Sequence, residues 1–97
     1  MRMKSPVHPG QLVKANLEHL GLSVAEAAAG MGITRQQLYR IIRCDSVVTS
    51  DMALRLEAAF GSTADMWLRM QSAYDLAEAR KRNAAAGIER FVPKKVA

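Results

Sequence analysis

Residues 23–43 read SVAEAAAGMGITRQQLYRIIR, and this stretch decides the fold of the chain. It begins with the capping box Ser23-x-x-Glu26, passes through three alanines to a pair of glycines, and starts again with a second capping box, Thr34-x-x-Gln37. A capping box marks the start of a helix, and glycine commonly ends one. The stretch therefore predicts two short helices joined by a tight turn, which are the parts of a helix-turn-helix.

The second of these helices is expected to have one apolar stripe and one polar face. Ile33, Leu38 and Ile41 have the spacing to pack against the first helix, where the small side chains of Ala27 and Ala28 permit close approach. No acidic residue lies between positions 27 and 44. The residues left facing outward are Arg35, Gln36, Tyr39, Arg40 and Arg43.

This polar face predicts a helix that reads DNA. The major groove of B-DNA, about 12 Å wide, admits one α-helix and offers guanine O6/N7 to Arg and adenine N6/N7 to Gln. Residues near the start of such a helix approach base edges. The alternative, a polar surface helix without a partner, accounts for any one of these side chains taken alone. The residues expected to contact bases are Thr34, Arg35, Gln36, Gln37 and Arg40.

Phosphate contacts are expected around these base contacts, because later helical residues and the flanking turns face the DNA backbone. Tyr39 and Arg43 are placed for this role. Free N–H groups at Ser23 and Val24 are expected to hold a further phosphate at the N-terminus of the first helix of the pair.

The rest of the chain is also expected to be helical, giving an all-α fold of five helices. With 97 residues, of which 49% are hydrophobic, the chain is long enough for one small core. Pro9 begins and Gly21 ends a first helix, and Ser/Thr starts predict a helix after Thr49 and a longer one after Ser62-x-x-Asp65. We therefore expect an N-terminal tail at 1–8, a domain at 9–82 with its helix-turn-helix at about 23–43, a last helix at about 63–82, and a basic tail at 83–97.

The last helix predicts a homodimer, because it has apolar residues on more than one face. One face is expected to cover the core, and the other to pair with a symmetry mate. Trp67 is interpreted as a core residue. The residues expected at the dimer interface are Met70, Ala73, Tyr74, Leu76 and Ala77.

Charge and composition exclude several classes of function. The net charge of +5 favours an anionic partner. A single cysteine excludes an internal disulfide and fits a reducing cytoplasm. Two histidines, no phosphate-binding loop and no nucleophile with an evident base predict no enzyme, no metal and no cofactor. His8 is read as an N-terminal packing or capping residue and His19 as a surface residue near a helix end. We expect neither a membrane segment nor a small-molecule substrate.

Several short motifs accompany the helix-turn-helix: "HPG" at positions 8–10, "LGLS" at 20–23, and "TSDMALRLEAAFGSTADMWLRMQSAYDLAEA" at 49–79. With these motifs the chain resembles the HigA family of antitoxins, within the XRE-type helix-turn-helix group. This resemblance implies a lambda-repressor-like DNA-binding domain and a small cytoplasmic homodimer. It also implies a palindromic operator in the protein's own operon, and a HigB-type ribonuclease toxin of RelE fold as partner. Two alternatives remain: a stand-alone repressor, and a toxin-binding protein with weakened DNA binding.

The chain departs from this family directly after the second helix of the pair. Family members usually have Asn-Gly there, whereas this chain has Arg43-Cys44-Asp45-Ser46. Cys44 must then adopt a left-handed conformation at a cost of about 1 kcal/mol, or the helix must end differently. Asp45 adds a negative charge where a phosphate contact is expected. A sensing role for Cys44 is not expected, because a lone cysteine at a helix end is usually inert.

Overall fold

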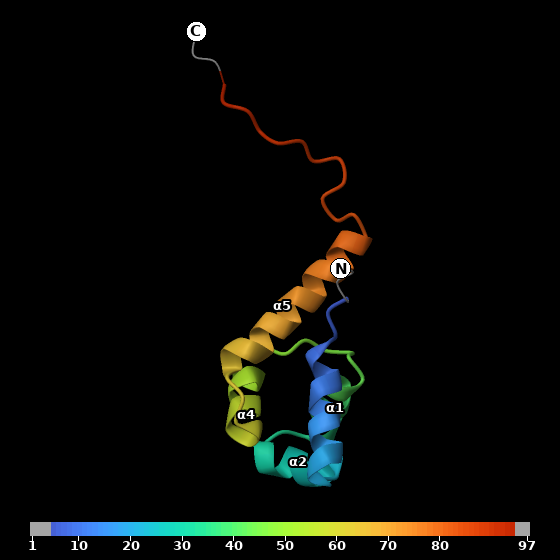
Figure 1. Ribbon diagram of the computed structural model, residues 1–97, viewed down its shortest axis with the longest axis vertical. Coiled ribbons are helices and arrows are strands. Elements are labelled where there is room, and N and C mark those ends of the chain that lie inside the picture. Colours follow the sequence, from blue (N-terminus) through green and yellow to red (C-terminus); the bar gives the residue numbers. More distant parts are fainter. Residues whose placement is uncertain (1–4, 95–97) are drawn as a thin grey trace.

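The computed structural model describes residues 5–94, and within that range it contains five helices and no strand. The all-α, five-helix prediction is confirmed. The N-terminal tail expected at 1–8 and the basic tail expected at 83–97 fall partly outside the described residues. Figure 1 shows α5 projecting from the body formed by the other helices. The helices are α1 (Pro9–Leu20), α2 (Val24–Met31), α3 (Arg35–Ile42), α4 (Ser50–Phe60) and α5 (Ala64–Lys81).

The helix starts follow the expected capping residues with one exception. Both predicted capping boxes form, with Ser23 before α2 and Thr34 before α3. The prediction that Ser62 opens the last helix is wrong by one residue, since Thr63 is the N-cap of α5. The reason is a tertiary contact: the Glu57 carboxylate accepts a hydrogen bond from the Ala64 N–H at 2.7 Å, which fixes the first turn of α5.

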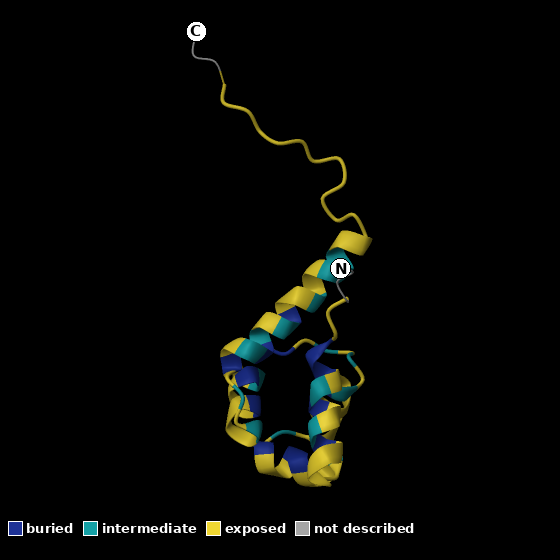
Figure 2. Cartoon of the chain, viewed as in Figure 1, coloured by how far each residue is buried: buried dark blue, intermediate teal, exposed yellow. Residues whose placement is uncertain are grey.

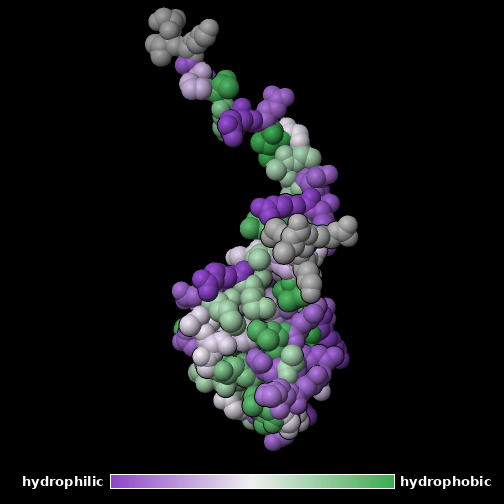
Figure 3. Space-filling view, viewed as in Figure 1, coloured by the Kyte–Doolittle hydropathy of each residue, from purple (hydrophilic) through white to green (hydrophobic). Residues whose placement is uncertain are grey.

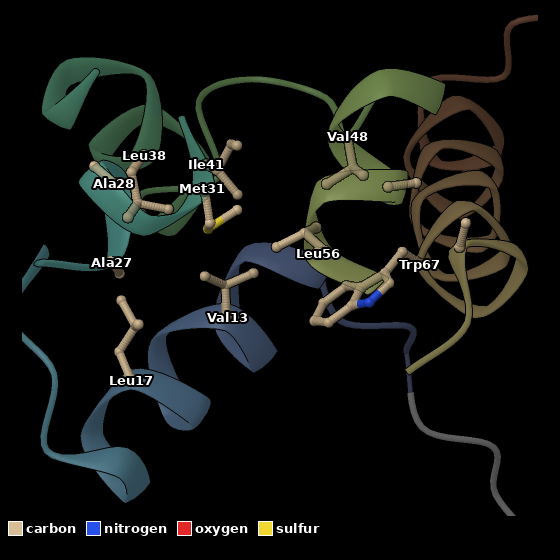
Figure 4. Close-up of a cluster of buried hydrophobic side chains, with 12 residues drawn as sticks. Val13, Leu17, Ala27, Ala28, Met31, Leu38, Ile41, Val48, Leu56 and Trp67 are labelled. Atoms are coloured by element: carbon tan, nitrogen blue, oxygen red, sulfur yellow. The ribbon is translucent and has the colours of Figure 1, made fainter. Parts of the chain in front are cut away.

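The core lies where α1, α2, α3 and α4 meet the first half of α5, as Figure 4 shows. Trp67 of α5 and Leu56 of α4 are fully buried at one end of it, and Leu38 of α3 at the other. The interpretation of Trp67 as a core residue is confirmed. Side chains from every helix therefore pack together, and the position of α3 depends on the whole core.

The N-terminus of α1 holds the end of α3 through a backbone contact. His8 caps α1, its Nδ1 accepting a hydrogen bond from the Gly10 N–H at 2.9 Å. The predicted capping role of His8 is confirmed, and His19 lies exposed in the last turn of α1 as expected. Gly10 lies so close to α3 that an added Cβ would overlap the Ile41 carbonyl. Only glycine fits this position without moving one of the two helices.

Polar side-chain contacts join segments that are far apart in the sequence. Gln71 of α5 is 5% exposed; its Oε1 accepts a hydrogen bond from the Val48 N–H at 2.8 Å, and its Nε2 donates to Asp75 at 2.9 Å. Arg55 of α4 donates to the Met31 carbonyl at the end of α2, at 2.6 Å. These contacts fix the loop before α4 and the last turn of α2.

Burial changes along α5. Figure 2 shows buried positions in its first half, a mixture of half-buried and exposed positions in its second half, and exposed positions in the segment that follows. All of residues 80–94 are exposed. The second half of α5 therefore contributes little to the core of a single chain.

Candidate nucleic-acid interface

The α2–α3 pair packs as the sequence predicted. Ala27 and Ala28 are buried, Leu38 and Ile41 are buried opposite them, and Ile33 is half-buried in the turn. Gly32 ends α2 in the left-handed region at φ 70°, and its N–H donates back to α2 carbonyls. The turn therefore sets the angle of α3 through backbone geometry that glycine adopts without strain.

One face of α3 is solvent-exposed and basic. Arg35, Gln36, Tyr39, Arg40 and Arg43 are all exposed and line a shallow concavity of about 590 Å³, which Asp45 and Ser46 complete. We call this surface the α3 groove. It brings five of the predicted DNA-contacting residues together on one face. Sequence reasoning assigned no role to Ser46, whose only signal is its place just after the end of the helix.

Two of the expected base-contacting residues are already engaged with the backbone. The Thr34 hydroxyl accepts a hydrogen bond from the Gln37 N–H at 3.0 Å, and Gln37 Oε1 accepts one from the Thr34 N–H at 2.8 Å. Gln37 Nε2 is not used in this pair and remains a donor. Thr34 and Gln37 thus first stabilise the start of α3, whereas Arg35, Gln36 and Arg40 have no such duty in the described structure.

Tyr39 and Arg43 lie together at the later end of the α3 groove. The Arg43 guanidinium lies over the Tyr39 ring, 5.3 Å from its centroid. Such a cation–π contact restricts the arginine while leaving its N–H donors available at the edge. The two residues expected at phosphates therefore form one unit.

Cys44 takes the left-handed conformation that its position requires. Its φ is 64°, its N–H donates to the Ile41 carbonyl at 3.0 Å, and the Asp45 N–H donates to the Arg40 carbonyl at 2.8 Å. These two bonds form the helix ending that normally has glycine at this position. Burial, and then the nearby Asp45 carboxylate, raise the pKa of the Cys44 thiol, which disfavours the reactive thiolate.

At the N-terminus of α2, the expectation of two free N–H groups is wrong. The Ser23 N–H is not free, because it donates to the Glu26 carboxylate at 3.2 Å. The Ser23 N–H and then the Ser23 hydroxyl lower the pKa of Glu26, which places a negative charge at this turn. Ser23 Oγ accepts the Glu26 N–H at 3.1 Å. A phosphate here would meet the Val24 N–H and would compete with the Glu26 carboxylate for Ser23, rather than meeting two free N–H groups.

The residues expected at a dimer interface divide into two groups. Met70 and Tyr74 turn toward the chain itself, with Met70 packed against the core and the Tyr74 ring 5.0 Å from the His8 ring. Ala73 and Leu76 are exposed, with Ala77 half-buried beside them. Only three of the five residues expected at a dimer interface therefore lie on the outward surface of α5.

Two specific features, a metal-ligand cluster and a membrane-spanning helix, are absent between residues 5 and 94. No group of three or more His, Cys, Asp or Glu side chains in this range is arranged to hold a metal. No helix in the same range has the length and apolar character needed to cross a bilayer.

Comparison with known proteins identifies the family. A helix-turn-helix family model (HTH_3) matches residues 13–67. The Escherichia coli protein YddM, described as an HTH-type transcriptional regulator, is 33% identical over 92 residues, which are 95% of this chain and 98% of that protein. Antitoxin HigA-1 of Vibrio cholerae is 35% identical over 80 residues, covering 81% of this chain and 75% of that protein.

Solved structures agree with this result. The Pseudomonas aeruginosa antitoxin HigA, solved with the higBA promoter, superposes with a TM-score of 0.81 at 30% identity, covering 90% of this chain and 99% of that one. The relatives described here are named as a transcriptional regulator and as antitoxins. This chain belongs to the XRE-type helix-turn-helix family and is a HigA-like member of it.

Proposed function

We propose that this protein is a sequence-specific repressor that binds the operator of its own operon through α3. The observation that carries the proposal is the α3 groove, where three arginines, a glutamine and a tyrosine face solvent on a helix without acidic residues. Support comes from a relative of the same fold whose structure contains promoter DNA. The charge and shape of α3 suit a major groove.

The proposed DNA contacts fall into two groups, contacts to base edges and contacts to phosphates. Arg35, Gln36 and Arg40 read base edges, and Gln37 adds its free Nε2 while Thr34 lies beside the first base pair. Tyr39 and Arg43 together hold one phosphate. Ser23 and Val24 hold another at the N-terminus of α2, against the opposing charge of Glu26.

We further propose that the protein acts as a homodimer in the cytoplasm. The exposed α5 surface around Ala73 and Leu76 supports an isologous contact. A two-fold dimer presents two copies of α3 about 34 Å apart, one turn of DNA, and so selects a palindromic operator. The likeness to antitoxin HigA-1 supports a second role, neutralising a HigB-type ribonuclease toxin.

Fluorescence anisotropy with the protein's own promoter fragment and a scrambled duplex of equal length tests the DNA-binding proposal. Arg40→Ala should reduce the preference for the promoter by about 1–3 kcal/mol, while Arg43→Ala should weaken both duplexes and lower the salt slope by about one. Arg69→Ala, which removes the same charge from an exposed position on α5, is the control. Equal losses on both duplexes with Arg40→Ala would rule out base reading by this residue.

A toxin-binding role with weak DNA binding is the second candidate, because Asp45 lines the α3 groove and repels phosphate. Asp45→Asn should then raise operator affinity several-fold, and more so at low salt. Co-expression with the adjacent gene product separates the antitoxin from a stand-alone repressor. Rescue of growth supports the antitoxin, and an adjacent product without toxicity supports the repressor.

A further inference from the structure

The chain leaves α5 through a fixed exit. Asn83 is in the left-handed region at φ 51°, the Ala84 N–H donates to the Ala79 carbonyl at 3.1 Å, and the Asn83 N–H donates to the Arg80 carbonyl at 3.0 Å. Two further turns follow, closed by the Ala86 N–H on the Asn83 carbonyl and the Ile88 N–H on the Ala85 carbonyl. Backbone hydrogen bonds therefore set the direction in which the following residues start.

Residues 88–94 extend away from the body. They belong to the basic C-terminal segment expected at 83–97, and from here on the word tail means residues 88–94 only. The radius of gyration is 18.1 Å, against about 12.5 Å for a compact domain of this length. Ile88 is 72% exposed, Phe91 92% and Val92 80%, the highest values among the large exposed hydrophobic side chains of the described chain. Figure 3 shows hydrophobic and hydrophilic groups mixed along this segment.

A matching apolar surface lies at the end of α5. A concavity of about 550 Å³ is lined by the apolar residues Leu76, Ala79 and the three alanines 84–86, together with Arg80 and Asn83. We call it the α5 groove. Leu76 is 52% exposed there. The tail of the same chain leaves the α5 groove uncovered.

We propose that the tail of one copy of this chain lies in the α5 groove of a second copy, and that the exchange is reciprocal. One chain exposes both halves of an apolar contact, and a two-fold axis satisfies both at once. The Asp75 and Glu78 carboxylates lie one residue from Leu76 and Ala79 on α5. Asp75 accepts a hydrogen bond from Gln71 and Glu78 pairs with Lys81 at 3.2 Å, so Arg90 of the incoming tail would add a second cation to this acidic side of α5. The proposal rests on the pairing of two copies proposed above, and extends that interface beyond Ala73.

Other occupants fit the tail less well. Phosphate contacts would use Arg90 and Lys94 but would leave Ile88, Phe91 and Val92 in water. A membrane surface calls for an amphipathic helix, whereas residues 88–94 are extended. A second copy is the occupant that uses the apolar and the charged side chains together.

Sedimentation equilibrium of the full chain gives the first test. Phe91→Ala should raise the dimer Kd by about 10- to 100-fold. Because Phe91 lies outside the core, helical content should not change. Leu20→Ala, an exposed apolar residue at the far end of α1, is the matched control and should leave the dimer Kd unchanged.

Disulfide trapping in a Cys44→Ser background gives the direct test. A mixture of Leu76→Cys and Phe91→Cys chains carrying different tags should form a covalent dimer that contains both tags. A chain carrying both cysteines that closes an internal disulfide instead would show that the tail folds onto its own α5 groove, which overturns the proposal.

The remaining outcomes separate this proposal from the one it rests on. If Phe91→Ala leaves the dimer Kd unchanged, the tail exchange is wrong while the α5 dimer stands. A wild-type chain that stays monomeric at micromolar concentration removes both. An effect of Phe91→Ala on DNA affinity with no change in dimer Kd would assign the tail to DNA and overturn the exchange.

Discussion

Helices α3 and α5 differ in how their buried and exposed residues are arranged within a single chain. α3 has eight residues, and its two faces have separate tasks: Leu38 and Ile41 are buried, and the residues of the α3 groove face solvent. α5 has eighteen residues, and its division runs along its length, with Trp67 and Gln71 buried early and Leu76 exposed late. A helix divided by face presents a surface for a ligand, while one divided by length leaves an end for another chain.

The strongest way to break this comparison is to disturb the seat of α3. Gly10→Ala would force a methyl group into the Ile41 carbonyl and should destabilise the fold by about 3 kcal/mol. Urea denaturation followed by circular dichroism measures the loss. Gly30→Ala is the control, because a Cβ at Gly30 meets no atom within 4 Å, and helix propensity should stabilise it by about 0.5–1 kcal/mol. Equal stability of the two variants would mean that α1 does not position α3.

The matching test for α5 is a substitution that removes a buried hydrogen-bond acceptor, the side-chain oxygen of Gln71. Gln71→Leu would leave the Val48 N–H unpaired in a position where Val48 is 3% exposed, and should cost about 2 kcal/mol. The same denaturation assay applies, with the exposed Ser72→Ala as control. Hydrogen exchange at Val48 as slow as in the wild type would show that another group accepts this bond.

The two helix ends offer a finer comparison, since each has a non-glycine residue with positive φ. Cys44→Gly should stabilise the protein by about 1 kcal/mol, while Asn83→Gly should gain less, because asparagine tolerates the left-handed region better than cysteine. Differences in urea midpoint measure both. A larger gain from Asn83→Gly would indicate that the two endings differ in more than backbone strain.

The smallest expected effect concerns the start of α2, the helix whose other end leads into the turn before α3. Because the pKa of Glu26 is lowered by folding, its contribution is present above the unfolded pKa and is lost as pH falls through the folded value. Glu26→Gln keeps the capping geometry without the charge. The stability advantage of the wild type over Glu26→Gln should therefore shrink on acidification from neutral pH. An advantage independent of pH would assign it to the hydrogen bonds alone.

Most of the α2–α3 unit could be predicted from the sequence, because its helix starts depend on residues that are close together in the chain. The boxes at Ser23 and Thr34 act within three residues, so spacing alone locates them. The departure from the family pattern left two possibilities, a left-handed Cys44 or a different end of the helix, and the structure has the first. The contacts of the DNA-facing residues remain predictions.

Long-range contacts were beyond the same reasoning. The overlap of Gly10 with Ile41, the Gln71–Val48 bond and the Arg55–Met31 bond join residues 23 or more positions apart, and periodicity contains no information about such pairs. The one-residue error at the start of α5 concerns a shorter contact, in which Glu57 of α4 accepts a hydrogen bond from the Ala64 N–H seven positions later. Burial along α5 depended on packing partners that its mixed apolar faces did not specify.

The way α3 is anchored also makes it open to redesign. Its start is held by Thr34 and Gln37, and its end rests against Gly10 through a backbone carbonyl. Neither anchor uses the side chains of Arg35, Gln36 or Arg40. Those three positions can therefore be randomised in a library without touching either anchor. Under the base-reading role proposed above for α3, such a library is a starting point for selecting variants that recognise new operator sequences.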